Sequence, residues 1–441
     1  MDRNTVLFPV ILVEPNSMRS MFHKSTLALI SLVLMVVAPA LAQQNKFTER
    51  LLQNRYALNF QEGHLSGTGV PVLQTAVTGA QFVLIGEDHG IAQIPQFSGA
   101  VCDFVGPQGF HTMAIETGPL AAGELQQWVN ANAGPAAVTE FDRKFPDSIA
   151  FYNFQEEYGL LAHCAHSAQD GKLHLWGLDQ ELMGAAGLIL TRILETHPGK
   201  TAGDETRRLV QKNAEALAVA VKSGSPGDVF MMSASDADLS HLNELLHKDG
   251  NAASQGLINA LIKSRAIYQK NMSGAGFESN RERSLLMKAN FVADYQQATQ
   301  SEGKPPKVLI KTGEFHSSKG FNPLHNNDLG NYVAEMADGQ GTTSLHIAIL
   351  GMKGSQLRFA GIGRPYQPGD FNLAEDKDSD FLFLKPMFDN LETGGWTMYD
   401  LRGLRKGLHS LEPVDKEMER LIFGYDLLVL IPNATPSKQI Q

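Results

Sequence analysis

Acidic and histidine side chains follow short apolar runs at four places in this sequence. These residues are Glu87 and His89, Glu116, Asp179, and Glu314 with His316. Carboxylates and imidazoles transfer protons and bind metal ions, so their type alone points to acid–base or metal chemistry. If the runs are parallel strands, their carboxyl ends meet along one edge of a sheet, where ligands bind in such folds. We therefore expect these side chains to share one site.

Two of these places carry the same short pattern, Glu-x-His, at 87–89 and at 314–316. On an extended chain, residues i and i+2 lie on the same side, so each segment would direct a carboxylate and an imidazole toward one point. Two such pairs suit proton transfer or a divalent metal ion, and the pattern does not decide between them. If a metal is present, its expected ligands are Glu87, His89, Glu116 and His316.

The apolar runs define the elements that must position these groups. They cover residues 81–85, 111–116, 172–179, 307–311, 344–350 and 426–431. Short apolar runs that alternate with helical stretches indicate buried parallel strands. The sequence therefore predicts an α/β fold with a central, mostly parallel sheet flanked by helices. Residues 43–75 show no such run, and we expect a helix and a loop there.

A long helical block separates the third predicted strand from the fourth. Amphipathic stretches cover 203–222, 236–248, 252–271 and 278–298, and together they predict a helical insertion at about 183–300. On the last stretch Arg283 and Asn290 share one face. A solvated face would explain them, but an arginine there also offers a fixed cation and planar donors. No internal repeat is visible, so residues 43–441 are expected to form one domain.

Composition and missing motifs restrict the function further. The 441 residues are 43% hydrophobic and 19% charged, with a formal net charge of -10. No lysine- or arginine-rich block is present, which disfavours nucleic-acid binding and leaves a small-molecule substrate as the expected partner. The chain lacks the Gly-x-Ser-x-Gly elbow of serine hydrolases, and its glycine patterns do not complete a nucleotide-binding motif.

The N-terminus has the features of an export signal. Basic residues precede an apolar run at 27–37, and small residues follow at 40–42. We expect a signal peptide at 1–42, with Met18 or Met21 as the true start. An uncleaved membrane anchor is the alternative, but the run is short for a membrane-spanning helix. The mature protein is therefore expected to be periplasmic or secreted, without a stable membrane span.

The two cysteines are Cys102 and Cys164. Cys102 lies in an apolar helical stretch, and we expect it to be a small core residue rather than half of a disulfide. The sequence does not set the distance between the two residues, so their pairing remains an alternative in an exported protein.

Several of these segments also match short motifs of a known superfamily. They are Leu84-Ile85-Gly86-Glu87-Asp88-His89-Gly90, Ala114-Ile115-Glu116, Arg283 with Met287 and Asn290, Gly313-Glu314-Phe315-His316, and Gly424-Tyr425-Asp426. In their order and spacing the chain resembles the erythromycin esterase-like superfamily, which also includes haem-binding lipoproteins of iron uptake and the TraB/TIKI group. The motifs extend from about 80 to 432, most of the mature chain. The resemblance implies a parallel-sheet α/β fold with a helical insertion.

The resemblance also implies roles for particular residues. In esterase members, residues that match His89, Glu116 and His316 are thought to activate water against a lactone ester, and residues that match Glu87 and Arg283 support them. Esterases usually carry Glu-x-x-His in the first motif, whereas this chain has Glu-x-His, which is closer to the haem-binding branch.

Two hypotheses follow. The first is an exported hydrolase of ester or amide bonds, in which His316 or His89 is the general base toward water and Arg283 stabilises the oxyanion. Its expected catalytic residues are Glu87, His89, Glu116, Arg283 and His316. Its expected substrate-binding residues are Asp179, Asn290 and Glu314. The alternative is a periplasmic protein that binds haem or a divalent metal without turnover.

Overall fold

The computed structural model describes residues 46–377, 379, 381–408 and 414–441, so the expected signal peptide lies outside the described residues. The strands are β1 (Arg55–Gln61), β2 (His64–Ser66), β3 (Phe82–Glu87), β4 (Phe110–Ile115), β5 (His174–Gly177), β6 (Lys307–Gly313), β7 (Ser344–Gly351), β8 (Lys353–Arg358), β9 (Gln367–Asn372), β10 (Trp396–Asp400) and β11 (Leu427–Ile431). The six predicted strands correspond to β3, β4, β5, β6, β7 and β11.

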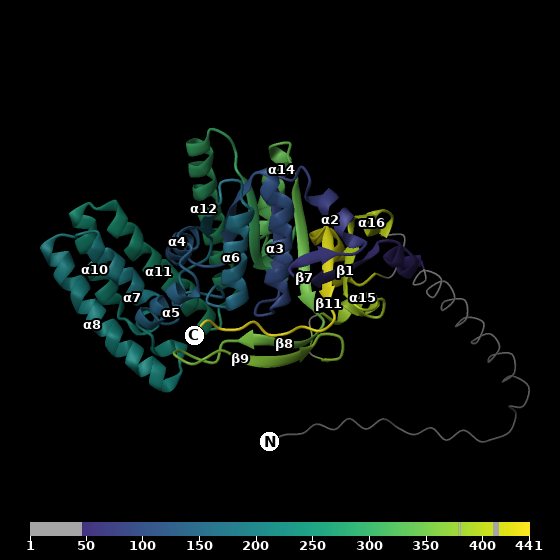
Figure 1. Cartoon of the computed structure of the whole chain (residues 1–441). Coiled ribbons are helices and arrows are strands. Elements are labelled where there is room, and N and C mark those ends of the chain that lie inside the picture. Colours follow the sequence, from purple (N-terminus) through teal and green to yellow (C-terminus); the bar gives the residue numbers. More distant parts are fainter. Residues whose placement is uncertain (1–45, 378, 380, 409–413) are drawn as a thin grey trace, which may run out of the picture.

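In the described part of the chain, nine strands form one sheet in the order β2-β1-β10-β11-β7-β3-β6-β4-β5, with helices around it (Figure 1). Pairing is parallel from β11 to β5 and antiparallel among β2, β1, β10 and β11. The predicted α/β class with a mostly parallel sheet is therefore confirmed. All six residues of β3 are buried, as expected for a central strand covered on both faces.

The helices around the sheet are α2 (Gly69–Val77), α3 (Gln93–Val105), α4 (Pro119–Asn130), α5 (Pro135–Lys144), α6 (Gln155–Ser167), α14 (Leu329–Gly339), α15 (Lys385–Phe388), α16 (Arg402–Arg405) and α17 (Lys416–Gly424). Successive side chains of a strand point to opposite faces, so Ile85 packs in the core with α3 and α6, and Leu84 packs in the core with α14. This alternation gives the sheet two apolar faces, each of which needs a helical layer.

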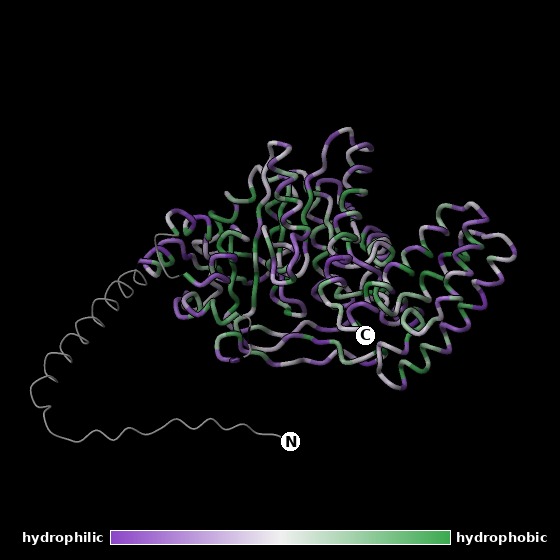
Figure 2. Tube along the Cα trace, turned by 180° about the vertical axis from the view of Figure 1, so that it is seen from behind, coloured by the Kyte–Doolittle hydropathy of each residue, from purple (hydrophilic) through white to green (hydrophobic). Residues whose placement is uncertain are grey.

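The helical insertion consists of α7 (Ala186–Glu195), α8 (Lys200–Ser223), α9 (Phe230–Ser233), α10 (Asp236–Asp249), α11 (Ala252–Met272) and α12 (Gly276–Glu302). Helices α7 to α11 form a lobe at one side of the sheet with an apolar core of its own (Figure 1). Green and purple residues alternate along these helices in Figure 2, as expected for amphipathic elements. The insertion therefore lies where the sequence placed it, and α12 leads the chain back to the sheet.

A hairpin and the C-terminal segment run below the sheet in Figure 1 toward the helical lobe. The hairpin is formed by β8 and β9, and Ile362 in the loop between them is buried in the core of the lobe. In the C-terminal segment, Ala434 forms a β-bridge with Gly354, and Gln439 forms one with Phe154. These contacts tie the lobe to the carboxyl edge of the sheet, where the candidate site lies.

The expectation of a helix and a loop at 43–75 is wrong in part, because β1 and β2 lie there. Only Leu58 of β1 is fully buried, and its partner strand β10 is near the other end of the chain. An edge region of this kind carries a weak apolar signal, and its strands are stabilised by pairing with distant residues. Among the described residues, no helix combines the length and apolar character needed to cross a membrane.

The expectation for the cysteines is also wrong. Cys102 of α3 and Cys164 of α6 form a disulfide, with 5.3 Å between their Cα atoms. Cys102 is buried as expected, but α3 and α6 pack side by side and bring the two thiols together. A sequence separation of 62 residues gave no sign of this contact.

Candidate active site

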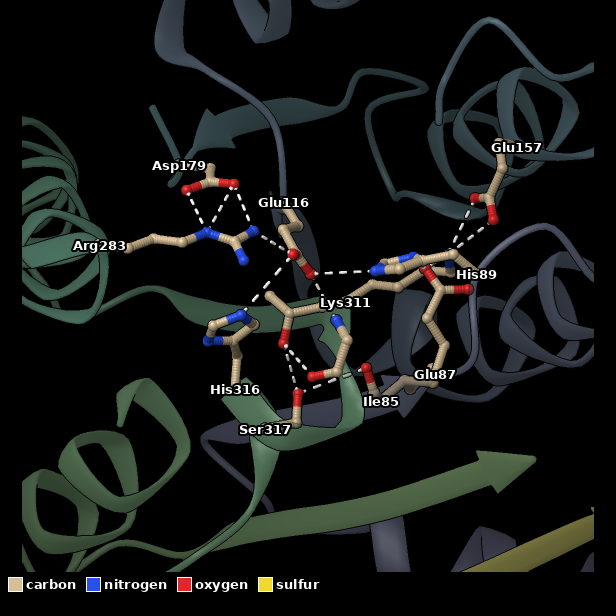
Figure 3. Close-up of polar contacts among 12 residues, drawn as sticks. Ile85, Glu87, His89, Glu116, Glu157, Asp179, Arg283, Lys311, His316 and Ser317 are labelled. Carbon is tan, nitrogen blue, oxygen red and sulfur yellow. Dashed lines mark hydrogen bonds and ion pairs between the residues drawn. The ribbon is translucent and has the colours of Figure 1, made fainter. Parts of the chain in front are cut away.

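The carboxyl ends of β3, β4 and β5 bring the acidic side chains together along one edge of the sheet. Glu87 is the last residue of β3, Glu116 follows β4, and Asp179 follows β5. Between β3 and β4 lies β6, which runs directly into α13 (Glu314–Ser317) and so places His316 at the same edge. Figure 3 shows that these residues form one connected group. The central geometric expectation from the sequence, a shared site at strand ends, agrees with the structure.

Glu116 is the hub of this group. Its carboxylate accepts hydrogen bonds from Arg283 Nη2 and from the backbone N–H of Gly313. His89 Nε2 lies 3.5 Å from one carboxylate oxygen, and His316 Nε2 lies 3.8 Å from the other. Burial raises the pKa of Glu116, but the positive charges of Arg283 and His89 outweigh it and hold the pKa well below its usual value. Glu116 is therefore ionised.

His89 lies between two carboxylates. Its Nδ1 is 3.1 Å from Glu87 Oε1, and its ring stacks on Phe151 with 3.9 Å between centroids. Burial lowers the pKa of His89, but the charges of Glu116 and Glu87 raise it well above its ordinary value, so the ring is a cation at neutral pH. Phe151 has a φ of 59°, a strained conformation for a bulky residue that often accompanies functional sites.

His316 also lies between two carboxylates, those of Asp328 and Glu116. Its Nδ1 is 2.8 Å from Asp328 Oδ2, and Asp328 also accepts a hydrogen bond from the backbone N–H of Leu329 at the start of α14. Asn322 donates a further hydrogen bond to Asp328. With Nδ1 held in this way, Nε2 is the nitrogen that faces Glu116 (Figure 3). This is the arrangement of a histidine oriented to accept a proton at Nε2.

The extended conformation expected for residues 314–316 is wrong, because Glu314 begins the helical turn α13. In a helix, residues i and i+2 do not share a face, so Glu314 does not pair with His316. Glu314 is half-buried, and its backbone carbonyl accepts a hydrogen bond from Tyr425 Oη. Burial and the nearby charge of Asp88 raise the pKa of Glu314 to about 8. The expected substrate-binding role of Glu314 remains a prediction.

The face of α12 expected to carry functional residues does face the site. Arg283 Nε donates to both oxygens of Asp179 at 2.9 and 3.1 Å, and Nη2 bridges Asp179 and Glu116. Among the residues drawn in Figure 3, none is joined to its Nη1 by a polar contact. Asn290 instead donates to the carbonyl of Leu178 at 2.9 Å. The structure therefore brings Arg283 and Asp179 into the cluster, whereas Asn290 secures the end of β5.

Sequence reasoning missed a buried pair beneath the cluster. The side chain of Lys311 is fully buried in β6, and it donates to Glu87 and to Glu157 of α6, with 2.8 Å to Glu157 Oε1. Burial raises the pKa of Glu157 to about 7 against the opposing charge of Lys311. A lysine at an inward-facing position of an apolar strand was the available signal, because lysine is almost never buried without a partner.

Alternating charges thus cross the strand ends without interruption. Following the contacts, the chain runs through Glu157, Lys311, Glu87, His89, Glu116, Arg283 and Asp179. His316 and Asp328 branch from Glu116. Because each buried charge has an opposite neighbour, the cluster is electrostatically tolerable despite its depth. Gly313 lies at its centre, since a Cβ there would be 3.2 Å from His89 Nε2 and 3.4 Å from Glu116 Oε2.

The four side chains that the sequence suggested as ligands do not fit a divalent metal ion. Among the described residues, no group of three or more His, Cys, Asp or Glu side chains is arranged to hold a metal ion. The two carboxylates that would lead such a set are already paired, Glu87 with Lys311 and Glu116 with Arg283. A divalent cation at that place would meet two fixed positive charges.

The site does not fit haem either. An axial ligand must face an open space of porphyrin size, but His316 is only 4% exposed and its Nε2 faces Glu116. The other imidazole, His89, is covered on one side by the ring of Phe151. The alternative of haem binding therefore gains no geometric support from the imidazoles on which it rested.

Comparisons with known proteins give structural neighbours only. No family model and no curated protein sequence matches the chain. A histidine-to-asparagine variant of the erythromycin esterase EreC in its open conformation superposes with a TM-score of 0.58 at 15% identity, over 88% of this chain and 99% of that one. The fold of this chain is similar to that of this esterase variant. This likeness supports the resemblance stated from the motifs at the level of the fold.

Two further solved structures have the same arrangement. A Bacillus cereus protein matches with a TM-score of 0.54 at 13% identity, and a succinoglycan biosynthesis protein matches with the same score at 14% identity. Each covers 90% of this chain and 99% of its own. At these identities the neighbours show a similar fold alone, and residue roles must be argued from the site itself.

Proposed function

We propose that this erythromycin esterase-like chain is a hydrolase of ester or amide bonds that attacks its substrate with water. The observation that carries the proposal is the orientation of His316. Asp328 holds its Nδ1 at 2.8 Å, and Nε2 faces Glu116 in the centre of the charged cluster. A histidine that is fixed at one nitrogen and directed into a polar site at the other is suited to general base catalysis.

The two histidines then have different tasks. His316 Nε2 takes a proton from a water molecule, whose oxygen bonds to the carbonyl carbon of the substrate. His89 already carries a proton because Glu87 and Glu116 stabilise its charge, which makes it a poor base and a suitable electrostatic partner for the oxyanion. The sequence left the choice of base open between these histidines, and the raised pKa of His89 favours His316 as the base.

Arg283 completes the proposed mechanism. Asp179 and Glu116 hold its Nε and Nη2, so that Nη1 remains for the oxygen that becomes negative in the tetrahedral intermediate. The intermediate collapses when the bond to the leaving group breaks, and the proton on His316 passes to the leaving oxygen or nitrogen. The products are an acid and an alcohol or amine, and His316 returns to its starting state.

We also propose that the protein acts outside the cytoplasm. The signal-like N-terminus motivates this, and the disulfide between Cys102 and Cys164 supports it because disulfides persist in oxidising compartments. Expression of the full chain followed by N-terminal sequencing of the periplasmic and medium fractions tests the location. Recovery only of uncleaved chain in the cytoplasm would contradict it.

A hydrolysis screen with matched histidine variants tests the catalytic proposal. The purified protein is assayed against a panel of esters, lactones and amides, and active substrates are repeated with His316→Ala and His89→Ala. The control is His163→Ala, because His163 forms a similar 2.8 Å pair with Asp103 on the exposed surface of α6. We expect both site variants to lose turnover and the control to keep it. Unchanged turnover in both site variants would reject the mechanism.

A further inference from the structure

A second concave feature lies beside the charged cluster. It is a cavity of about 530 Å³ between α13, the loop after it, β7 and α17. Its volume is within the range of about 300–1,000 Å³ that is typical of pockets for small organic ligands. None of the residues of the charged cluster lines it, whereas Glu314, two residues before His316, does. The cavity is therefore a neighbour of the proposed catalytic site rather than a part of it.

The walls of this cavity are mainly aromatic and aliphatic. Phe315 stacks on Phe381 with 6.5 Å between ring centroids and 14° between their planes, and Phe383 lies next to Phe381 at 6.2 Å. Leu350 of β7 and Leu421 of α17 also line the cavity. Aromatic rings in these offset arrangements provide flat apolar surfaces on which another ring packs favourably.

Glu314 connects the cavity to the catalytic cluster. It lines the cavity, and its charge also interacts with those of Asp88, His89 and Glu116. The segment between α13 and α14 makes a second connection. It lines the cavity at Asn322, and the same Asn322 donates a hydrogen bond to Asp328, which orients His316. A group bound in the cavity would therefore lie next to the residues that hold the proposed base.

We propose that this cavity binds the uncharged aromatic or bulky apolar portion of the ester substrate, and that Glu314 contacts the substrate where this portion joins the reacting carbonyl group. This inference rests on the proposed hydrolase function and specifies its substrate class. The apolar walls favour hydrophobic groups because their burial removes apolar surface from water. With a pKa of about 8, the carboxyl group of Glu314 is mostly protonated at neutral pH and can donate a hydrogen bond.

Substrates that differ only in the apolar group test the inference. The p-nitrophenyl esters of acetic acid and of hydrocinnamic acid share the same aromatic leaving group, and only the second also carries a phenyl ring in its acyl portion. We expect the ratio of kcat/KM values, hydrocinnamate over acetate, to exceed 10 in the unmodified protein. In Leu421→Trp the indole occupies the cavity, and we expect the ratio to fall at least tenfold. Leu421→Phe, a smaller change, replaces it if the tryptophan variant does not fold.

A matched control comes from the neighbouring segment. Leu382 lies between two cavity-lining phenylalanines, but it is itself 40% exposed and does not line the cavity. Leu382→Trp therefore adds the same indole outside the cavity, and we expect it to leave the ratio of kcat/KM values within twofold of the unmodified protein. An equal fall of the ratio in both variants would overturn the inference.

A binding measurement separates this inference from the hydrolase proposal. Benzylacetone is a ketone with the same phenyl-ethyl group and has no ester bond to cleave. We expect saturation transfer in NMR from the protein to its ring protons, with loss in Leu421→Trp and retention in Leu382→Trp. Transfer with this pattern in a protein that cleaves none of the esters, lactones and amides would support the cavity and reject the hydrolase function. Ester cleavage without transfer, and with an unchanged ratio in Leu421→Trp, would overturn the cavity inference alone.

Discussion

The two Glu-x-His segments look alike in the sequence and differ in the structure. At 87–89 the backbone leaves strand β3, and both side chains join one line of charges, with Glu87 bound to Lys311 and His89. At 314–316 the backbone turns into α13, so His316 pairs with Asp328 and Glu314 remains apart. Backbone conformation therefore decides whether neighbouring acidic and basic groups cooperate, even when their spacing along the chain is identical.

The electrostatic consequences of this difference are opposite. The pKa of Glu87 is lowered, because the charges of Lys311 and His89 outweigh the effect of its burial. The pKa of Glu314 is raised to about 8, because burial and Asp88 disfavour its charged form. The first segment is built as a permanently charged support, whereas the second contains the group proposed to accept and return a proton. Substitutions in and around the two segments should therefore have different effects on stability and on turnover.

The largest effect is expected from the second segment. His316→Ala should lower kcat on any ester that the protein hydrolyses by about 10²–10⁴-fold, the usual contribution of a general base. The same variant removes the imidazole partner of the buried Asp328, so the free energy of unfolding must be measured beside kcat. Steady-state kinetics and urea denaturation measure the two quantities. If the fall in kcat is no larger than the loss of folded protein accounts for, the proposed role of His316 is wrong.

For the first segment, we expect the loss of a partner of Glu87 to lower the stability of the fold. Lys311→Met removes the buried cation between Glu87 and Glu157, and the uncompensated carboxylates should lower the free energy of unfolding by about 3–5 kcal/mol. Lys307→Met is the control, because Lys307 stands on the same strand with a half-buried side chain and should change stability by less than about 0.5 kcal/mol. Equal unfolding midpoints for the two variants would show that the charged chain does not support the fold.

Asp328 tests how the second segment is oriented. Asp328→Asn keeps the shape of the side chain but can no longer stabilise the positive charge that His316 gains when it takes a proton. It also permits the tautomer with the proton on Nε2, which cannot act as the base. We expect kcat to fall by at least about 10²-fold, as in other enzymes in which a carboxylate orients a histidine. Asp338→Asn, at the exposed end of α14, is the comparison and should retain full turnover. Similar kcat values for both variants would mean that Asp328 only caps the helix.

The smallest effect concerns the pH dependence of stability. The pKa of Glu314 rises from its usual value near 4.5 to about 8 on folding, so the folded protein binds this proton more tightly than the unfolded chain. The contribution of Glu314 to stability is therefore complete at low pH and is lost as the pH rises toward 8. Glu314→Gln should gain about 1–2 kcal/mol relative to the unmodified protein between pH 5 and 9, after allowance for partial exposure. Parallel stability curves would show that Glu314 is ionised throughout.

Much of the site could be predicted from local sequence signals. Glu87, Glu116, Asp179 and His316 lie at the carboxyl edge because each follows an apolar run, and parallel strands end at one edge. The helical periodicity at 278–298 put Arg283 and Asn290 on one face but left open whether that face meets the site or solvent; in the structure Arg283 contacts Glu116. These signals are local, since a few consecutive residues are enough to define a buried strand or an amphipathic helix.

What the sequence determined by itself was the six parallel strands, the helical insertion and the edge where polar groups gather, because apolar periodicity is visible in consecutive residues. Only the tertiary structure decided the partners. Lys311 with Glu157, His316 with Asp328 and Cys102 with Cys164 are contacts formed by packing. Each depends on how separate elements lie against one another, and the chemistry of the individual residues does not encode that arrangement.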